Sequence, residues 1–234
     1  RYNSLINSGV RFSRKDNRIK YSRDVGQRYT IIALSESMMH GIKKLNVDNV
    51  KVVPHGFLPF KGSIDFSLFD RFGIPTERKI LFIPSYNHKA ELSNVFFNNK
   101  DFDTFLEKNN YFLIIKDRNS ISNNKNVKVI STWLTESEYK FFFLACFCII
   151  LPYDNTAPFR ESGVIMECFA NNKLCLKLDI PSLQIYDQYF NYKSCFSNIA
   201  SLMVRLKTLD DITQPFYKHL DKISNPYQGW HNLL

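Results

Sequence analysis

The stretch PFRESGVIMECF, residues 158–169, holds the residues whose types and spacing best suit a binding site. Ser162 and Gly163 precede an apolar, helix-like run, and Glu167 lies four residues after the glycine. A helix N-terminus presents unpaired N–H groups and about half a positive charge, and glycine has no side chain that would hold a ligand away. Such an end can bind a phosphate. Since residues four apart share a helix face, Glu167 can accept hydrogen bonds from the hydroxyls of a ribose joined to that phosphate.

Taken alone, this S-G-x-x-x-E pattern is also typical of an ordinary helix start, in which Glu167 reaches solvent or pairs with a cation. A second candidate is Lys89, which lies in a polar loop after the apolar run KILFIPS. A lysine in such a loop can bind a departing diphosphate, and a solvated surface lysine is the alternative.

We find little support in the sequence for other kinds of catalytic site. Residues 101–103 have the D-x-D pattern of a metal site, but they open a predicted helix, where aspartate is favoured as a cap. We find no cluster with metal-ligand spacing and no Ser-His-Asp or Cys-His arrangement. Most of the five cysteines lie in apolar stretches, which is typical of buried free thiols in a reducing cytosol. We therefore expect no metal and no cofactor.

Strand-like and helix-like stretches alternate along the chain, and the strand-like ones are almost continuously apolar. This pattern is typical of a parallel sheet with helices on both faces. The predicted strands are residues 29–35, 50–54, 79–85, 111–116, 127–131, 146–153, 173–178 and 194–197. The predicted helices are 36–45, capped by Ser35, then 65–73, 101–109, 135–145, one starting at Ser162-Gly163, 181–190 and 198–209. Thr135 and Glu138 have the spacing of a capping box.

These elements predict an α/β fold, a Rossmann-like doubly wound parallel sheet over residues 50–205. Residues 1–49 are expected to be the tail of an N-terminal domain or a linker, and residues 206–234 a C-terminal helix and tail. Ligands of such sheets bind outside the carboxyl ends of the strands. The residues that follow the predicted strands are polar, small or cationic: His55-Gly56, Pro84 to Lys89, Lys116-Asp117, Ser131 to Trp133 and Pro152 to Gly163.

The composition narrows the classes of partner. The chain has 234 residues, 44% of them hydrophobic, and a formal charge of +9. This excess suits a phosphorylated ligand or an anionic membrane surface, whereas the lack of a dense Lys/Arg block makes nucleic acid the least favoured partner. The longest uninterrupted apolar run, residues 141–151, is 11 residues long. A membrane span needs about 20. We expect a cytoplasmic protein, with peripheral contact with the inner face of the membrane as a further expectation.

Several motifs, taken in order, resemble the group 1 glycosyltransferases of the GT-B fold, and specifically their C-terminal, donor-binding domain. They are ALSESMMHGIKKL with VKVVPHGF, LFIPSYNHKAEL, VKVIS, TESEYKFFFLACFCIILPY and SGVIMECFANNKLCLKLDIPSL. The resemblance covers roughly residues 29–190, and although each motif is loose, the ordered set is fairly specific.

The resemblance implies a nucleoside diphosphate sugar as the donor, with its diphosphate on the amides of Ser162, Gly163 and Val164. Lys89 matches the family's phosphate-binding lysine, and Glu167 matches the glutamate that binds the ribose. Thr132 and Trp133 match the loop around the base, where Trp133 either stacks or packs beneath the loop. His55 and Gly56 match the inter-domain loop, and a structural turn histidine is the alternative for His55.

The sequence departs from the family's pattern at two places. The family has another glutamate eight positions before the ribose-binding one, near the donor sugar, and here that position holds Phe159. Glu161 can substitute for it if the loop differs. The family's arginine ahead of the lysine is also missing, with Ser85 or Asn87 near its place, and Arg160 can supply the second positive charge.

We therefore expect a glycosyltransferase, a hexosyltransferase that moves a sugar to a glycan or lipid-linked acceptor in surface polysaccharide synthesis. Only about 50 residues precede the Rossmann-like unit. If the chain is an excerpt of a longer protein, we expect it to bind donor but to lack the acceptor site, and an inactive fragment is then one of the expectations. Two alternatives stay open. One is a sugar-nucleotide 2-epimerase, which shares the fold and the Ser-Gly turn. The other is a non-catalytic module that binds a nucleotide or a partner protein, which the missing first glutamate favours.

Overall fold

The computed structural model describes residues 30–44, 47–53, 59–61, 65–84, 99–117, 122, 124–153, 162–212 and 216–220. These residues fall into two compact units, and each is described by itself. The first unit contains the described residues up to Val53, and the second contains those from Pro59 onward.

The first unit contains a small parallel β-α-β motif, in which α3 (Glu36–Lys43) connects β1 (Ile31–Ala33) to β2 (Val50–Val52). Ser35 caps α3 as predicted, because its side chain accepts a hydrogen bond from the Met38 amide at 3.1 Å. Because β2 pairs with β1, it belongs to this unit, whereas the sequence analysis began the Rossmann-like domain at residue 50.

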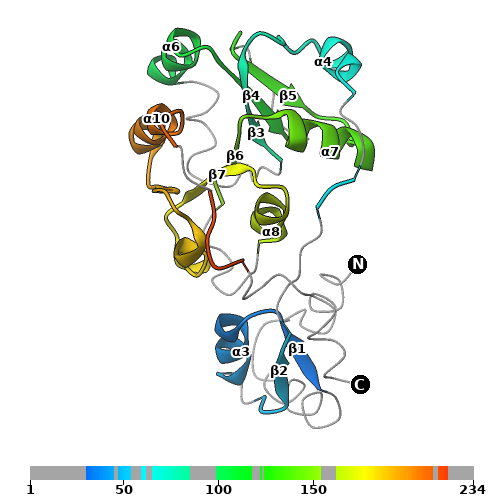
Figure 1. Cartoon of the computed structure of the whole chain (residues 1–234), viewed down its shortest axis with the longest axis vertical. Helices are drawn as coiled ribbons and strands as arrows, with labels where there is room; N and C mark the ends of the chain where they lie inside the picture. The colour runs from blue at the N-terminus through cyan, green and yellow to red at the C-terminus, as the bar shows by residue number, and fades with distance from the viewer. Residues whose placement is uncertain are drawn as a thin grey trace. The chain divides into compact units, whose positions relative to one another are not determined.

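The second unit is built on a parallel sheet with the strand order β5-β4-β3-β6-β7-β8 (Figure 1). The strands are β3 (Lys79–Ile83), β4 (Tyr111–Lys116), β5 (Val127–Ile130), β6 (Cys148–Leu151), β7 (Leu174–Leu178) and β8 (Cys195–Phe196). The chain passes outward from β3 through β4 to β5 on one side of the sheet. It then continues from β6, which lies beside β3, through β7 to β8 on the other side. This is the doubly wound Rossmann arrangement, and the predicted fold class is confirmed.

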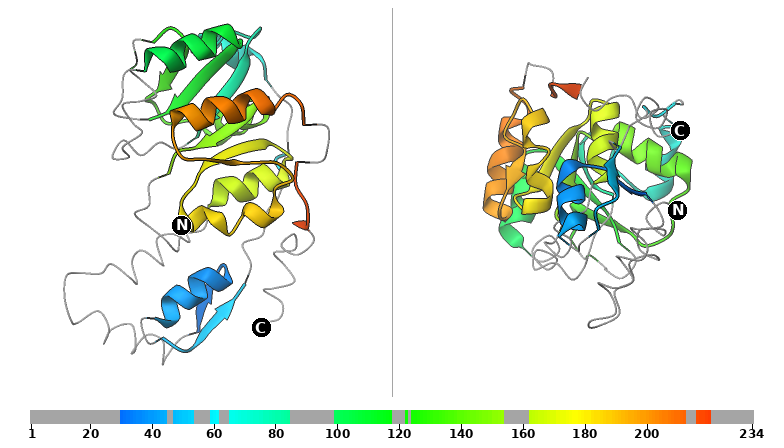
Figure 2. Two further views of the ribbon diagram at one scale, coloured as in Figure 1. Left: turned by 90° about the vertical axis from the view of Figure 1, so that its left-hand side faces the viewer. Right: turned by 90° about the horizontal axis from the view of Figure 1, so that it is seen from below.

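Helices cover both faces of this sheet. They are α4 (Ser67–Phe72), α6 (Lys100–Lys108), α7 (Glu136–Ala145), α8 (Gly163–Ala170), α9 (Pro181–Gln184), the 3-10 helix η1 (Asp187–Tyr189) and α10 (Ile199–Thr208). Figure 1 shows α6 and α10 on one side of the strands and α4, α7 and α8 on the other. In the left view of Figure 2, α6 and α10 lie in front of the strands.

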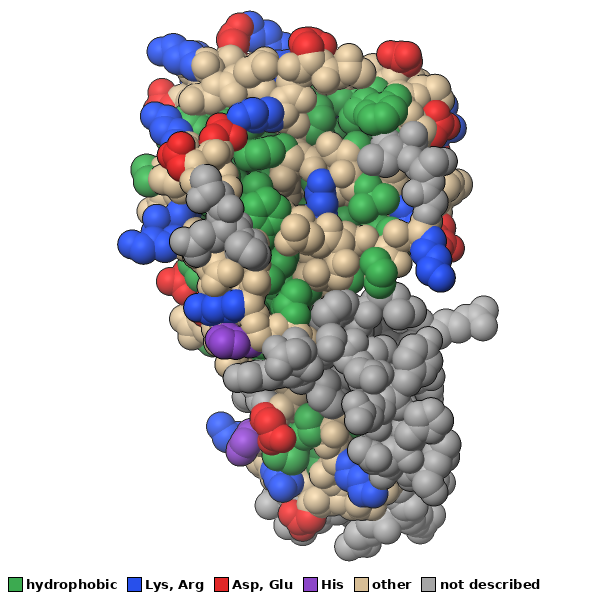
Figure 3. Space-filling view, viewed as in Figure 1, with side chains coloured by type: hydrophobic (Ala, Val, Ile, Leu, Met, Phe, Trp, Pro, Cys, Tyr) green, Lys and Arg blue, Asp and Glu red, His purple; other side chains and the backbone are tan. Residues whose placement is uncertain are grey.

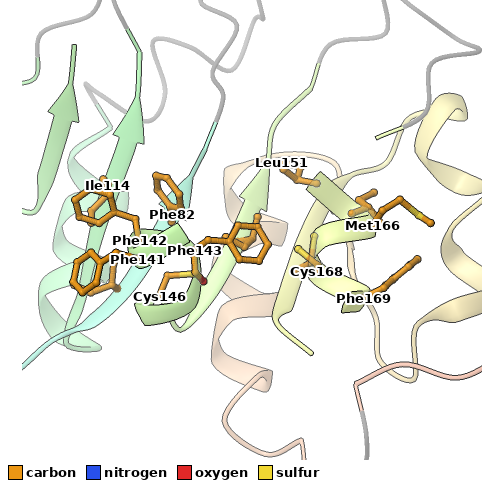
Figure 4. Close-up of a cluster of buried hydrophobic side chains, with 14 of the residues drawn as sticks. Phe82, Ile114, Phe141, Phe142, Phe143, Cys146, Leu151, Met166, Cys168 and Phe169 are labelled. Carbon is orange, nitrogen blue, oxygen red and sulfur yellow. The ribbon is translucent and has the colours of Figure 1, made fainter. Parts of the chain in front are cut away.

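The layering follows from the alternation of side chains along each strand. On β3, Ile80 and Phe82 join the core beneath α4, α7 and α8, whereas Leu81 and Ile83 join the core beneath α6 and α10. Figure 4 shows the first of these cores, in which side chains of α7 and α8 lie over the same face of the sheet. Both faces of β3 are buried from Ile80 to Ile83, which is why these four residues are apolar, whereas Lys79 at the start of the strand is exposed.

Some of the helix ends match the capping signals that the sequence predicts, and one does not. Thr135 and Glu138 form the predicted capping box on α7, and Gly73 ends α4 with φ 63°. The cap of α6, however, is Asn99, which accepts a hydrogen bond from the Phe102 amide at 2.8 Å, and the aspartates of the D-x-D pattern lie in the first turn.

Two predicted boundaries also differ. The predicted helix 181–190 is divided into α9 and η1, and α10 runs through the boundary proposed at residue 205. Leu206 of α10 is fully buried against the sheet, so the whole helix belongs with the second unit.

The surface of the second unit carries charges of both signs. In Figure 3, Lys and Arg side chains lie among Asp and Glu side chains rather than in one basic patch on this face. Ion pairs join some of them, such as Lys79 with Asp210 at 2.6 Å and Lys125 with Glu107 at 2.8 Å. Across the described ranges, no helix is long and apolar enough to cross a membrane.

All five cysteines lie within the described ranges, and each is a free thiol. Four of them are buried: Cys146, Cys148, Cys168 and Cys175. Burial raises the pKa of the Cys146 thiol to about 12, and it raises the pKa of the thiols of Cys148 and Cys168 well above the usual range. Cys195 alone is partly exposed.

We expect Cys195 to be the one thiol that iodoacetamide alkylates readily in the folded protein at pH 8. The selectivity comes from access: the other four thiols are buried and shielded from the reagent, whereas Cys195 is partly exposed, although partial burial raises the pKa of its thiol as well. Peptide mass spectrometry of the alkylated protein would show one modified cysteine in buffer and five in urea. Alkylation of Cys168 as fast as that of Cys195 in the folded state would contradict this assignment.

Candidate functional site

The centre of the sheet is the place where the strand order reverses. β3 and β6 are neighbours there, with Leu81 opposite Cys148 and Phe82 opposite Ile149. The chain leaves the carboxyl end of β3 toward the segment that contains Lys89, and it leaves β6 through Pro152 toward Ser162. Since ligands of doubly wound sheets bind at this switch point, the two segments with candidate residues start at the expected position.

Hydrogen bonds within the protein fix the N-terminus of α8. Ser162 is the N-cap in an extended conformation, and its Oγ accepts a hydrogen bond from the Ile165 amide at 3.3 Å. Ser162 is only 4% exposed, and its own amide donates to Tyr186 Oη at 2.8 Å. The Ser162 amide therefore has a partner and does not face a ligand, unlike the role that the family resemblance implies for it.

Two amides at this end remain available. Among the described residues, no acceptor contacts the N–H groups of Gly163 and Val164. Gly163 is exposed, and a Cβ added to it would meet no atom within 4 Å. The space beside the Cα of Gly163 is therefore open, and with the positive end of the helix dipole these amides can bind an anionic oxygen.

Glu167 lies one turn further along α8, as the spacing predicts, and it is partly buried. Its Oε2 accepts a hydrogen bond from Tyr139 Oη of α7 at 2.5 Å. Burial, and then the negative charge of Glu167, raises the pKa of the Tyr139 phenol well above its usual value. The phenol therefore stays protonated and donates to the carboxylate.

The loop between β5 and α7 contains Thr132 and Trp133, and both are exposed. Trp133 is 79% exposed, so it does not pack beneath its loop, and its ring is presented to solvent at the carboxyl edge of the sheet. The same segment leads into α7, whose Tyr139 contacts Glu167. The loop that contains Trp133 is thus linked to α8 through α7, whose Tyr139 donates a hydrogen bond to Glu167.

The other candidate residues lie outside the described residues. They are His55, Gly56, Ser85, Lys89, Arg160 and Glu161. Their roles stay predictions, as does the choice between Phe159 and Glu161 near the donor sugar. The described ranges contain no group of three His, Cys, Asp or Glu side chains that could hold a metal ion.

Sequence reasoning missed two polar contacts at the start of α8, those of Tyr186 and Tyr139. It placed Tyr139 on the apolar face of its helix, which is correct, but it assigned no partner to the hydroxyl. A tyrosine hydroxyl inside a protein usually has a hydrogen-bond partner, so the position of Tyr139 on an apolar helix face is the signal that points to one. No signal in the sequence pairs Tyr186 with Ser162, which lies 24 residues away.

No protein-family model and no curated protein matches this chain. Solved structures do. A glycosyltransferase from Rickettsia africae ESF-5 superimposes with a TM-score of 0.60 at 12% identity, over 95% of this chain and 63% of that one. Anabaena Alr3699/HepE in complex with UDP superimposes with a TM-score of 0.57 at 13% identity, over 86% of this chain and 59% of that one.

The chain has the GT-B glycosyltransferase fold. A UDP-GlcNAc 2-epimerase from Methanocaldococcus jannaschii is also similar, with a TM-score of 0.52 at 11% identity over 93% of this chain and 63% of that one. The GT-B fold therefore occurs in both enzyme classes that the sequence analysis named. This chain spans about three fifths of the length of each of these structures.

Proposed function

We propose that this chain binds a nucleoside diphosphate sugar and forms the donor-binding part of a glycosyltransferase. The observation that carries the proposal is the N-terminus of α8, where two amides have no acceptor among the described residues and lie one turn before a carboxylate, with open space beside Gly163. Amides and a helix dipole suit a diphosphate, and a carboxylate suits the two hydroxyls of a ribose. The complex of HepE with UDP, a protein of similar fold, supports a nucleotide of this kind.

In this proposal, negative charge develops on the diphosphate as it leaves the sugar. The helix N-terminus, Lys89 and Arg160 would stabilise that charge, and electrostatic stabilisation of a leaving group is a common source of rate enhancement. Glu161 would contact the donor sugar, and Trp133 is exposed at a position where it can stack on the base. The acceptor is a glycan or a lipid-linked sugar in surface polysaccharide synthesis, and no metal takes part.

Titration calorimetry of the 234-residue protein with UDP, GDP and their sugars tests the proposal directly. We expect one base series to bind with a dissociation constant in the range of about 1 μM to 1 mM, as is typical of enzyme substrates. Inorganic diphosphate should bind more weakly, because it makes no contact with Glu167. If neither nucleotide nor any of their sugars binds, the proposal is wrong.

A 2-epimerase is the second candidate, because two 2-epimerase structures superimpose with TM-scores of 0.52. Conversion of UDP-N-acetylglucosamine without any acceptor would favour it. Donor binding without conversion or transfer by the full-length protein would instead favour a non-catalytic binding module, since fold alone does not determine activity.

A further inference from the structure

Tyr139 connects two helices that carry different parts of the candidate site. It lies in the second turn of α7, and its hydroxyl donates to Glu167 of α8, 28 residues away, at 2.5 Å. A short hydrogen bond to an ionised acceptor is stronger than one between neutral groups, and it constrains direction as well as distance. The contact therefore specifies where one oxygen of the Glu167 carboxylate lies.

The Tyr139 ring is held from several sides. Phe60 packs against it edge-on with ring centroids 6.2 Å apart, Phe143 lies at 5.9 Å and Phe82 at 6.3 Å. Phe82 comes from β3 and Phe143 from α7 itself, so the ring is packed between the sheet and its own helix. A ring packed in this way cannot swing its hydroxyl away from Glu167 without disturbing the core.

The direction of the hydrogen bond is also set. Because the Tyr139 phenol stays protonated, it acts as the donor and Glu167 as the acceptor. The carboxylate is thereby oriented before any ligand arrives. A group oriented in advance loses less conformational freedom on binding, which improves affinity.

We infer that Tyr139 is a positioning residue, which holds the Glu167 carboxylate in the orientation that binds the ribose hydroxyls of the nucleotide. This inference rests on the proposed function. It assigns to α7 a part in ribose recognition that is separate from the phosphate contacts at Gly163 and Val164. Loss of the phenol should therefore weaken the binding of ligands with ribose hydroxyls and spare ligands without them.

The test compares Tyr139→Phe with the wild-type protein, using UDP or GDP, whichever the wild type binds, and the 2′,3′-dideoxy form of the same nucleotide. Phenylalanine keeps the ring packing and removes only the donor. We expect the affinity for the nucleotide to fall about tenfold and the affinity for the dideoxy form to stay unchanged. A general structural defect would weaken both ligands equally, and that outcome would overturn the inference.

Tyr111→Phe is the matched control. Tyr111 is 1% exposed, and its hydroxyl donates to the Leu206 carbonyl at 3.1 Å, beneath α10 on the other face of the sheet. This variant also loses one tyrosine hydroxyl and its hydrogen bond, so it should lose some stability but no nucleotide affinity. An equal loss of nucleotide affinity in Tyr111→Phe would also overturn the inference.

A double variant shows whether Tyr139 acts through Glu167. In a Glu167→Ala background, which offers the phenol no acceptor at this position, removal of the Tyr139 hydroxyl should cost little further affinity, and a full additional tenfold loss would contradict the inference. If Tyr139→Phe does not fold, Glu167→Asp replaces it, because the shorter side chain withdraws the carboxylate from the phenol. Wild-type affinity in Glu167→Asp would overturn the inference. If the wild type binds neither nucleotide, the proposed function fails, and the inference fails with it.

Discussion

Replacing Gly163 with valine should abolish nucleotide binding while the protein stays as stable as the wild type. The added side chain would enter the open space beside Gly163, and in the proposed site the phosphate approaches the Gly163 and Val164 amides past this residue. Hydrogen bonds to a charged group are worth ~1.5–3 kcal/mol each, so the loss of two predicts an affinity about 100-fold lower or worse. Since the Cβ of the new side chain would meet no atom within 4 Å, we expect the free energy of unfolding to change by less than about 0.5 kcal/mol.

Gly73→Ala is the control for this prediction, because its expected effects are reversed. Gly73 ends α4 with φ 63°, a left-handed conformation that costs a residue with a side chain about 1 kcal/mol or more. It lies before the amino end of β3, away from the carboxyl edge. We expect a lower melting temperature and unchanged calorimetric affinity. Unchanged affinity in Gly163→Val would show that the ligand does not rest on these amides.

The second large effect concerns a charge that is buried in the sheet. Lys177 of β7 has a side chain that is fully buried, and its Nζ lies 2.5 Å from Asp187 Oδ1 of η1 and 3.0 Å from Cys195 Sγ of β8. Asp187→Ala would leave the ammonium group without its counter-charge. Breaking a buried pair in this way typically costs ~3–5 kcal/mol. We expect the lower part of that range, because 47% of the Asp187 side chain is exposed and water can partly replace it.

Urea unfolding followed by circular dichroism would measure this cost, with Lys177→Met and the double variant as controls. Lys177→Met leaves Asp187 half-exposed and solvated, so it should cost much less than Asp187→Ala. The double variant should recover most of the stability, since it removes both charges. If Asp187→Ala has the urea midpoint of the wild type, the pair does not stabilise the fold.

Local patterns along the chain determined the elements and their class. Continuous apolar runs such as ILFI and CIIL predict strands with both faces buried, and T-x-x-E and S-G-x-x-x-E predict where α7 and α8 begin. These signals are readable because caps, alternation and helical spacing depend on neighbours within a few residues. They also placed Gly163 and Glu167 on one helix, one turn apart. The ends of the helices and strands were harder to predict, since the single helix predicted over residues 181–190 is in fact α9 followed by η1.

The tertiary structure alone decided which distant groups meet. It made β3 and β6 neighbours, turned the Ser162 amide toward Tyr186, and placed the Tyr139 phenol on Glu167. It also buried Lys177 beside Asp187, although the sequence shows only a lysine within an apolar strand. Each of these contacts joins different elements, and it forms because the packing of the whole core selects the position of each element. The sequence therefore determined which residues stand at the start of α8, and packing decided which of their polar groups remain open to a ligand.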